Sequence, residues 1–143
     1  MDLRRITDTF SVSPQIDPDD VPAIKAAGFK SILCNRPDQE EEGQCDHTLI
    51  EAAAQGAGLV FGNVPITSGG ITSANLDDFA AALARLPAPV LAYCRSGTRC
   101  TMLWSMGQIG QMSNAEIIAA AAEAGYDVRN VIAQMTGEPG GHG

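Results

Sequence analysis

Short apolar segments alternate with longer amphipathic segments along this 143-residue chain, and Gly or Pro residues separate most of them. Apolar runs of strand length cover residues 9–13, 30–34, 59–64 and 90–93. Helical spacing of apolar residues covers residues 17–28, 44–55, 72–86, 99–109 and 113–124, and a last short helix is predicted from residue 127. The pattern therefore predicts strands and helices in alternation.

Capping signals support several of these boundaries. Asp17 followed by Pro18 is typical of a helix start, and Gly28 is typical of a helix end. Ser113 and Glu116 have the spacing of a capping box, in which each side chain bonds to the other residue's backbone amide.

Strands that alternate with three-turn helices indicate βαβ units. We therefore predict an α/β fold with a mostly parallel central sheet of about four to five strands and helices on both faces. Residues 9–13 are expected to add an edge strand. Residues 1–135 are expected to form a single domain, and residues 136–143 a flexible tail with nothing to bury.

The composition narrows the classes of partner. The chain is 45% apolar and 18% charged, which is typical of a globular domain, and its net charge is −8. This acidic balance argues against nucleic acid or an anionic membrane, whereas a small anionic substrate still fits a locally positive pocket. No signal peptide or membrane span is expected, and four cysteines in such a chain are expected to be thiols of a cytoplasmic protein. No motif indicates a metal or another cofactor, and the oligomeric state is left open.

Three loops follow predicted parallel strands, at residues 34–44, 65–72 and 94–99. Ligands of open α/β sheets bind outside the carboxyl ends of the strands. We therefore expect the three loops to face one crevice with Cys94 at its floor.

The sequence around Cys94 has the features of an anion-binding loop with a nucleophile. Gly97 permits a tight backbone turn, and Arg99 offers a planar fork of donors to an oxyanion. Backbone amides and the following helix N-terminus would lower the pKa of the Cys94 thiol and activate it. A cysteine that only packs in a core needs neither the glycine nor two arginines. Cys94 and Arg99 are therefore the catalytic candidates, and the binding candidates in the loop are Arg95, Ser96, Gly97 and Thr98.

The motif YCRSGTR resembles the active-site loop of single-domain rhodaneses. Over nearly all of residues 1–135, however, the chain is similar to the phosphatase-like domain of beta-lactamase-hydrolase-like proteins. The resemblance rests on NRPDQEEEGQ, VPITSGGIT, YCRSGTR and AAEAGYD. It implies a dual-specificity protein tyrosine phosphatase fold, in a family that is described both as phosphatase and as sulfur transferase.

Three departures from tyrosine phosphatases favour sulfur transfer. Four residues separate Cys94 from Arg99 where phosphatases have five, the loop at 65–72 carries no aspartate as general acid, and Cys100 stands where Ser or Thr is usual. The carboxylates of RPDQEEE, on the loop at 34–44, would be a weaker substitute for that acid. The primary expectation is thus a rhodanese-like sulfurtransferase that forms a Cys94 persulfide from a sulfane-sulfur donor. The alternative is hydrolysis of phosphate esters through a Cys94 phosphoenzyme. A third reading is an anion-binding or redox-sensing module without turnover.

Residues on the neighbouring loops are expected to complete the pocket. Arg36 would supply charge to the substrate, and Thr67 and Ser68 would stand where an acid is expected. Cys34 ends a strand on the same edge as Cys94 and is a possible redox partner for it, although simple burial would explain it as well.

Overall fold

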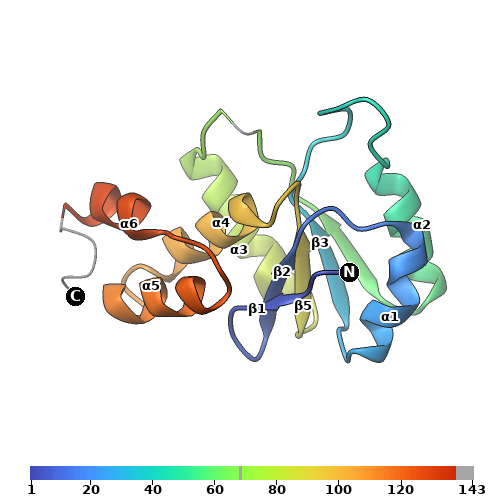
Figure 1. The fold of residues 1–143 in the computed structure, drawn as a ribbon, viewed down its shortest axis with the longest axis horizontal. Helices are drawn as coiled ribbons and strands as arrows, with labels where there is room; N and C mark the ends of the chain where they lie inside the picture. Colours follow the sequence, from blue (N-terminus) through green and yellow to red (C-terminus); the bar gives the residue numbers. More distant parts are fainter. Residues whose placement is uncertain (68, 138–143) are drawn as a thin grey trace.

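The computed structural model describes residues 1–67 and 69–137, and a central sheet runs through them (Figure 1). Its strands are β1 (Arg4–Arg5), β2 (Phe10–Ser13), β3 (Ser31–Cys34), β4 (Val60–Asn63) and β5 (Val90–Tyr93). Their order within the described residues is β1-β2-β5-β3-β4. β2, β5, β3 and β4 are parallel, and β1 is antiparallel to β2. The expected mostly parallel sheet is confirmed.

Residues 9–13 were expected to form an edge strand, but β2 is an interior strand of the sheet. It pairs with β5 on one side and with β1 on the other, so β1 and β4 are the edge strands of the described sheet. β1 was not predicted, because two consecutive arginines show no apolar alternation. It pairs with β2 after a short turn in which the amides of Ile6 and Thr7 donate to the carbonyl of Phe10.

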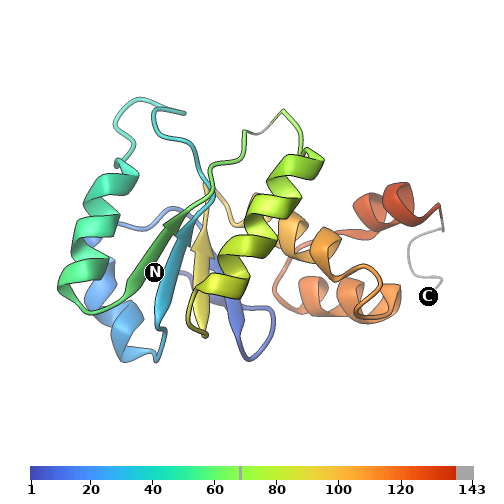
Figure 2. The same ribbon diagram turned by 180° about the vertical axis from the view of Figure 1, so that it is seen from behind.

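Helices cover both faces of the sheet, as predicted (Figures 1 and 2). They are α1 (Val21–Ala26), α2 (His47–Gly56), α3 (Ser73–Arg85), α4 (Thr98–Gln108), α5 (Asn114–Glu123) and α6 (Arg129–Thr136), and a 3₁₀ turn at Pro18–Asp20 precedes α1. α1 and α2 lie on one face and α3 and α4 on the other, while α5 and α6 pack against α4 farther from the sheet. The expected helix from residue 44 begins later, at His47.

Alternating side chains of β5 divide the interior into two cores. Leu91 and Tyr93 face the core under α1 and α2, whereas Val90 and Ala92 face the core under α3 and α4. Successive residues of a strand point to opposite faces, so Cys94 points to the same side as Val90 and Ala92, into the core under α3 and α4. Cys94 is fully buried there. The parallel strands thus hold the cysteine in a fixed place at their carboxyl ends.

In the part of the chain that the structure describes, every helix is too short or too polar to cross a bilayer. Most of the expected tail, residues 138–143, lies outside the described residues. The single domain over residues 1–135 and the flexibility of the tail therefore stay predictions.

Candidate active site

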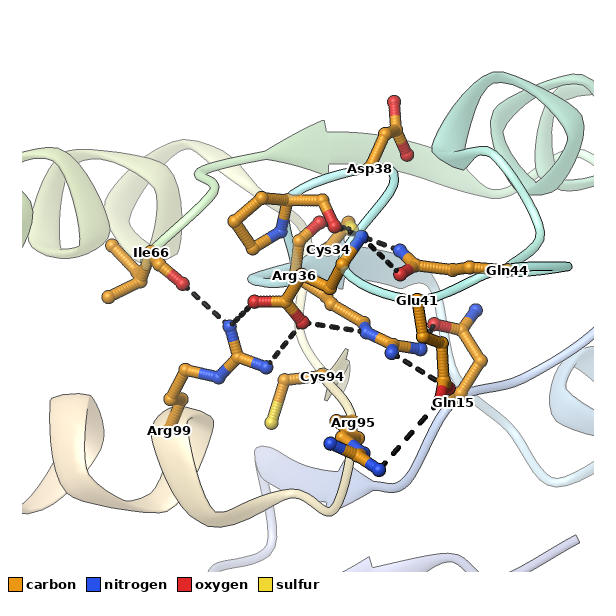
Figure 3. A network of polar contacts seen from close by, with 12 residues as sticks. Gln15, Cys34, Arg36, Asp38, Glu41, Gln44, Ile66, Cys94, Arg95 and Arg99 are labelled. Carbon is orange, nitrogen blue, oxygen red and sulfur yellow. Dashed lines mark hydrogen bonds and ion pairs between the residues drawn. The ribbon is translucent and has the colours of Figure 1, made fainter. Parts of the chain in front are cut away.

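The loops after β3, β4 and β5 meet at one edge of the sheet (Figure 3). The Arg99 guanidinium, at the start of α4, donates to the Glu40 carboxylate on the loop after β3. It also donates to the Ile66 carbonyl on the loop after β4, at 2.8 Å. Arg99 therefore joins the three loops that the parallel topology brings together.

Cys94 lies at the floor of the loop between β5 and α4. The chain turns at Gly97, whose φ of 89° lies in the left-handed region, and α4 begins at the next residue. This turn lets the Gly97 amide donate to the Cys94 sulfur at 3.1 Å. The loop thus wraps its backbone donors around the sulfur, as expected for an anion-binding nest.

The surroundings of Cys94 lower the pKa of its thiol from the ordinary 9.0 to about 5. The first cause is interaction with the Cys100 thiol, and the amides of Cys100, Ser96 and Gly97 also lower the pKa, while burial opposes them. Burial and the neighbouring sulfur raise the pKa of Cys100 itself well above its ordinary value. Cys94 is therefore a thiolate at neutral pH, and Cys100 stays protonated beside it as a donor.

Tyr126, on the segment between α5 and α6, supports the loop from outside. Its hydroxyl donates to the Ser96 carbonyl at 2.9 Å. A Cβ atom at Gly97 would lie 2.2 Å from the Tyr126 hydroxyl oxygen, so the contact requires glycine for its space as well as for its φ. Sequence reasoning missed Tyr126 as a site residue, since the only signal was its place in the AAEAGYD motif.

The Arg99 fork holds a carboxylate. Its Nη1 lies 2.7 Å from Glu40 Oε2, and its Nη2 lies 2.8 Å from Glu40 Oε1. Hydrogen bonding with Arg99, and then with Arg36, lowers the pKa of Glu40 to about 2 against the opposing effect of burial. Arg99 thus has a bidentate, charge-assisted anion contact within the chain itself.

Arg36 is buried and bound by three side chains of the protein itself. Its side chain is 2% exposed, with Nε on Glu40 at 2.8 Å, Nη1 on Gln15 at 3.0 Å and Nη2 on Glu41 at 3.0 Å. All three guanidinium nitrogens thus have partners within the protein, and the expected contact of Arg36 with a substrate stays a prediction. Arg95 is different, because its exposed guanidinium makes only a loose contact of 3.7 Å with Glu41.

A hollow of about 260 Å³ is lined by Arg99 and Thr67. Its other lining residues are Gly70, Ile71, Met102, Met106, Val131 and Gln134. Cys94 is not among its lining residues, so the expected place of Thr67 at the Cys94 pocket stays a prediction. Ser68 lies outside the described residues, so its expected place in the pocket stays a prediction. The hydroxyls of Ser96 and Thr98 bond to each other at 2.9 Å on the exposed side of the loop.

Cys34 is buried in the core on the other face of the sheet from Cys94. Its thiol donates to the Arg36 carbonyl at 3.2 Å. Burial raises the pKa of this thiol. All four cysteines are unpaired, so a redox role for Cys34 stays a prediction. Among residues 1–67 and 69–137, no group of three or more His, Cys, Asp or Glu residues could hold a metal ion.

Known proteins resemble this chain in sequence and in structure. A beta-lactamase hydrolase-like protein of Agrobacterium fabrum is 34% identical over 126 residues, which are 87% of this chain and 29% of that protein. The chain thus spans less than a third of that relative. The crystal structure of a putative phosphatase from Neisseria meningitidis is also 34% identical, with a TM-score of 0.85, and the match covers 96% of this chain and 98% of that one.

A more distant structure shares the fold alone. The core catalytic domain of a PP-IP phosphatase from S. cerevisiae, in complex with citrate, is 16% identical with a TM-score of 0.65; the match covers 96% of this chain and 93% of that one.

The expectation of sulfur transfer is wrong, because the matching family model describes a phosphatase-like domain and the Neisseria structure is that of a putative phosphatase, and both support the alternative of phosphate-ester hydrolysis. Two features of the structure bear on the arguments for sulfur transfer. A carboxylate reaches Arg99 from the loop after β3 instead of the loop after β4, and the Cys100 thiol provides a donor where Ser or Thr is usual. The likeness of residues 94–99 to the rhodanese loop stays a prediction.

The family match covers most of the chain, including the three loops that form the site. It spans residues 2–111, which contain the sheet and helices α1 to α4. The chain belongs to the family described as the phosphatase-like domain of beta-lactamase hydrolase-like proteins.

Proposed function

We propose that this chain is a cysteine-dependent phosphatase that hydrolyses phosphate monoesters through a Cys94 phosphoenzyme. The observation that carries the proposal is a buried thiolate at the floor of a loop of backbone donors, with an arginine fork beside it. Such a site offers a nucleophile and an oxyanion cradle in one loop.

In the first step, the Cys94 thiolate attacks the phosphorus of the ester. The sulfur–phosphorus bond forms as the bond from phosphorus to the ester oxygen breaks, and the alcohol oxygen leaves with the electron pair and gains a proton. Loop amides and the Arg99 fork would stabilise the charge on the equatorial phosphoryl oxygens, because both are oriented before the substrate arrives.

In the second step, water attacks the phosphocysteine and the Cys94 thiolate leaves. The group that stabilises this thiolate most, the Cys100 thiol, assists its departure. Four loop residues between Cys94 and Arg99 are one fewer than tyrosine phosphatases have, yet the Gly97 amide reaches the sulfur. The substrate of the proposed reaction is a small anionic phosphate ester, and Arg95 at the exposed rim would attract it.

The proposal is tested with 4-nitrophenyl phosphate and phenyl phosphate, and with mass spectrometry of acid-quenched enzyme. We expect Cys94-dependent release of phosphate and a transient mass gain of one phosphoryl group on the peptide that contains Cys94. Cys94→Ser should lose turnover and still bind inorganic phosphate, whereas Cys45→Ser, at a partly exposed cysteine away from the loop, should behave as wild type. Absence of phosphate release from both esters would refute the proposal, and phosphate binding without any turnover would favour the anion-binding module.

A further inference from the structure

The side chain of Glu40 binds two arginines of the site, Arg99 and Arg36. Both of its oxygens contact the Arg99 fork, and Oε1 is shared with Arg36 Nε at 2.8 Å. Its side chain is only 21% exposed, and its backbone amide is held by Gln44 Oε1 at 2.9 Å. Glu40 is therefore fixed at the mouth of the loop.

A phosphoryl group bound over Cys94 would use the same donors. Arginine binds carboxylate and phosphate in the same bidentate geometry, so one Arg99 fork serves one anion at a time. A phosphate monoester carries more negative charge than a carboxylate and would also accept hydrogen bonds from the loop amides. Replacement of the Glu40 carboxylate by the phosphoryl group on Arg99 is therefore favourable. The hydrogen bond from Arg36 Nε to Glu40 Oε1 is independent of Arg99 and would hold the displaced Glu40 within the site.

We propose that Glu40 is the proton donor of the reaction, kept on Arg99 in the empty site and released to the leaving oxygen when a phosphoryl group takes its place. This inference rests on the phosphatase function proposed above. Glu40, on the loop after β3, would thus be the general acid that the loop after β4 lacks.

The exchange also changes the protonation of Glu40. Its pKa of about 2 depends first on the hydrogen bonds with Arg99, which the substrate removes. The negative phosphoryl group then stands beside the carboxyl group and raises the pKa further, since a like charge disfavours ionisation. Glu40 can thus take up a proton from water as the substrate binds.

The proton balance closes over the two steps. As the Cys94 sulfur bonds to phosphorus, the ester oxygen leaves with the electron pair and takes the proton of Glu40, which becomes a carboxylate. In the second step this carboxylate accepts a proton from the attacking water, so the protonated state is restored. The net reaction consumes one water and releases an alcohol and phosphate.

The neighbouring carboxylates are less suited to the role. Asp38 is bound to the His47 ring at 2.6 Å and to its amide at 2.9 Å. Glu41 is half-exposed and contacts Arg36 and Arg95. Within the described residues, Glu40 is the carboxylate bound to Arg99.

The test compares Glu40→Gln with Glu42→Gln on two esters that differ in their leaving group. Glutamine keeps the shape and can still accept from Arg36, but it donates no acidic proton. Glu42 is an exposed carboxylate of the same loop and serves as the matched control. With phenyl phosphate, whose phenolate leaves poorly, we expect Glu40→Gln to lose about 100-fold or more in kcat/KM, which reports only the steps up to formation of the phosphoenzyme. With 4-nitrophenyl phosphate, whose phenolate needs no proton, the loss should be small, and Glu42→Gln should match wild type on both.

A second measurement examines the exchange without chemistry. In the Cys94→Ser background, calorimetry should show tighter binding of inorganic phosphate when Glu40→Gln is added, because a charged competitor is removed from Arg99. An equal loss of kcat/KM on both esters, or unchanged phosphate affinity, would overturn the assignment of Glu40. A wild-type protein that hydrolyses neither ester would instead refute the phosphatase function, so the two failures are distinguishable.

Discussion

The low pKa of Cys94 depends first on one neighbour, and Cys100→Ala removes that neighbour. The difference between the ordinary thiol pKa of 9.0 and the value of about 5 corresponds to about 5 kcal/mol of preferential stabilisation of the thiolate. A hydrogen bond to a charged group contributes about 1.5–3 kcal/mol, which is about 1–2 in pKa. We therefore expect the pKa of Cys94 to rise to about 6–7 in Cys100→Ala, because the amides of Ser96 and Gly97 remain.

The pKa is measured from the pH dependence of Cys94 alkylation by iodoacetamide. Mass spectrometry of the separate peptides distinguishes alkylation at Cys94 from alkylation at the other three cysteines, Cys34, Cys45 and Cys100. Cys100→Ser, which keeps a donor at the same position, is the control and should stay closer to wild type. If Cys100→Ala alkylates with the wild-type midpoint, the Cys100 thiol does not stabilise the thiolate and the reasoning is wrong.

Three further predictions concern the loop and its supports. In wild-type protein, Cys94 alkylation should fall as pH decreases through about 5, because a thiolate with a lowered pKa is protonated only below that value; a midpoint near the ordinary 9.0 would contradict the site. Gly97→Ala should lower the free energy of unfolding in urea by more than about 1 kcal/mol, since a left-handed φ disfavours alanine and its Cβ would clash with Tyr126; Gly107→Ala, at an exposed helical position with open space, should be neutral or stabilising. Ser113→Ala should cost about 1 kcal/mol in the same urea assay through loss of the capping box of α5, and an unchanged midpoint would argue against that cap.

Local patterns in the sequence were sufficient for most of the fold. Apolar runs bounded by Gly and Pro located β3, β4 and β5 to within a residue or two, and the Ser113 capping box located the start of α5. Strand order depends instead on contacts between distant segments. For that reason residues 9–13 were assigned to an edge, and the pair Arg4–Arg5, which has no apolar alternation, was missed.

The site likewise has a part set by local sequence and a part set by contacts between distant segments. The loop from Cys94 to Arg99 was predicted because its residues are consecutive and its chemistry is local. The contact of Arg99 with Glu40 joins residues 59 positions apart, and the three consecutive glutamates at 40–42 gave no sign of which one would reach it. The acid was expected on the loop after β4, where tyrosine phosphatases carry it, and its absence there favoured sulfur transfer.

The contact of Tyr126 with the loop has a consequence for how the site is assembled during synthesis. Tyr126 bonds to Ser96 from beyond α5, and the Arg4 guanidinium from β1 lies 5.1 Å from the centre of its ring. The nucleophile loop is thus supported by segments near both ends of the described chain. Since a ribosome releases the chain from its N-terminus, Cys94 emerges about thirty residues before Tyr126 can support its loop. The cradle reaches its final shape only when α5 and the segment after it have folded onto α4, so the reactivity of the thiolate becomes a property of the completed fold.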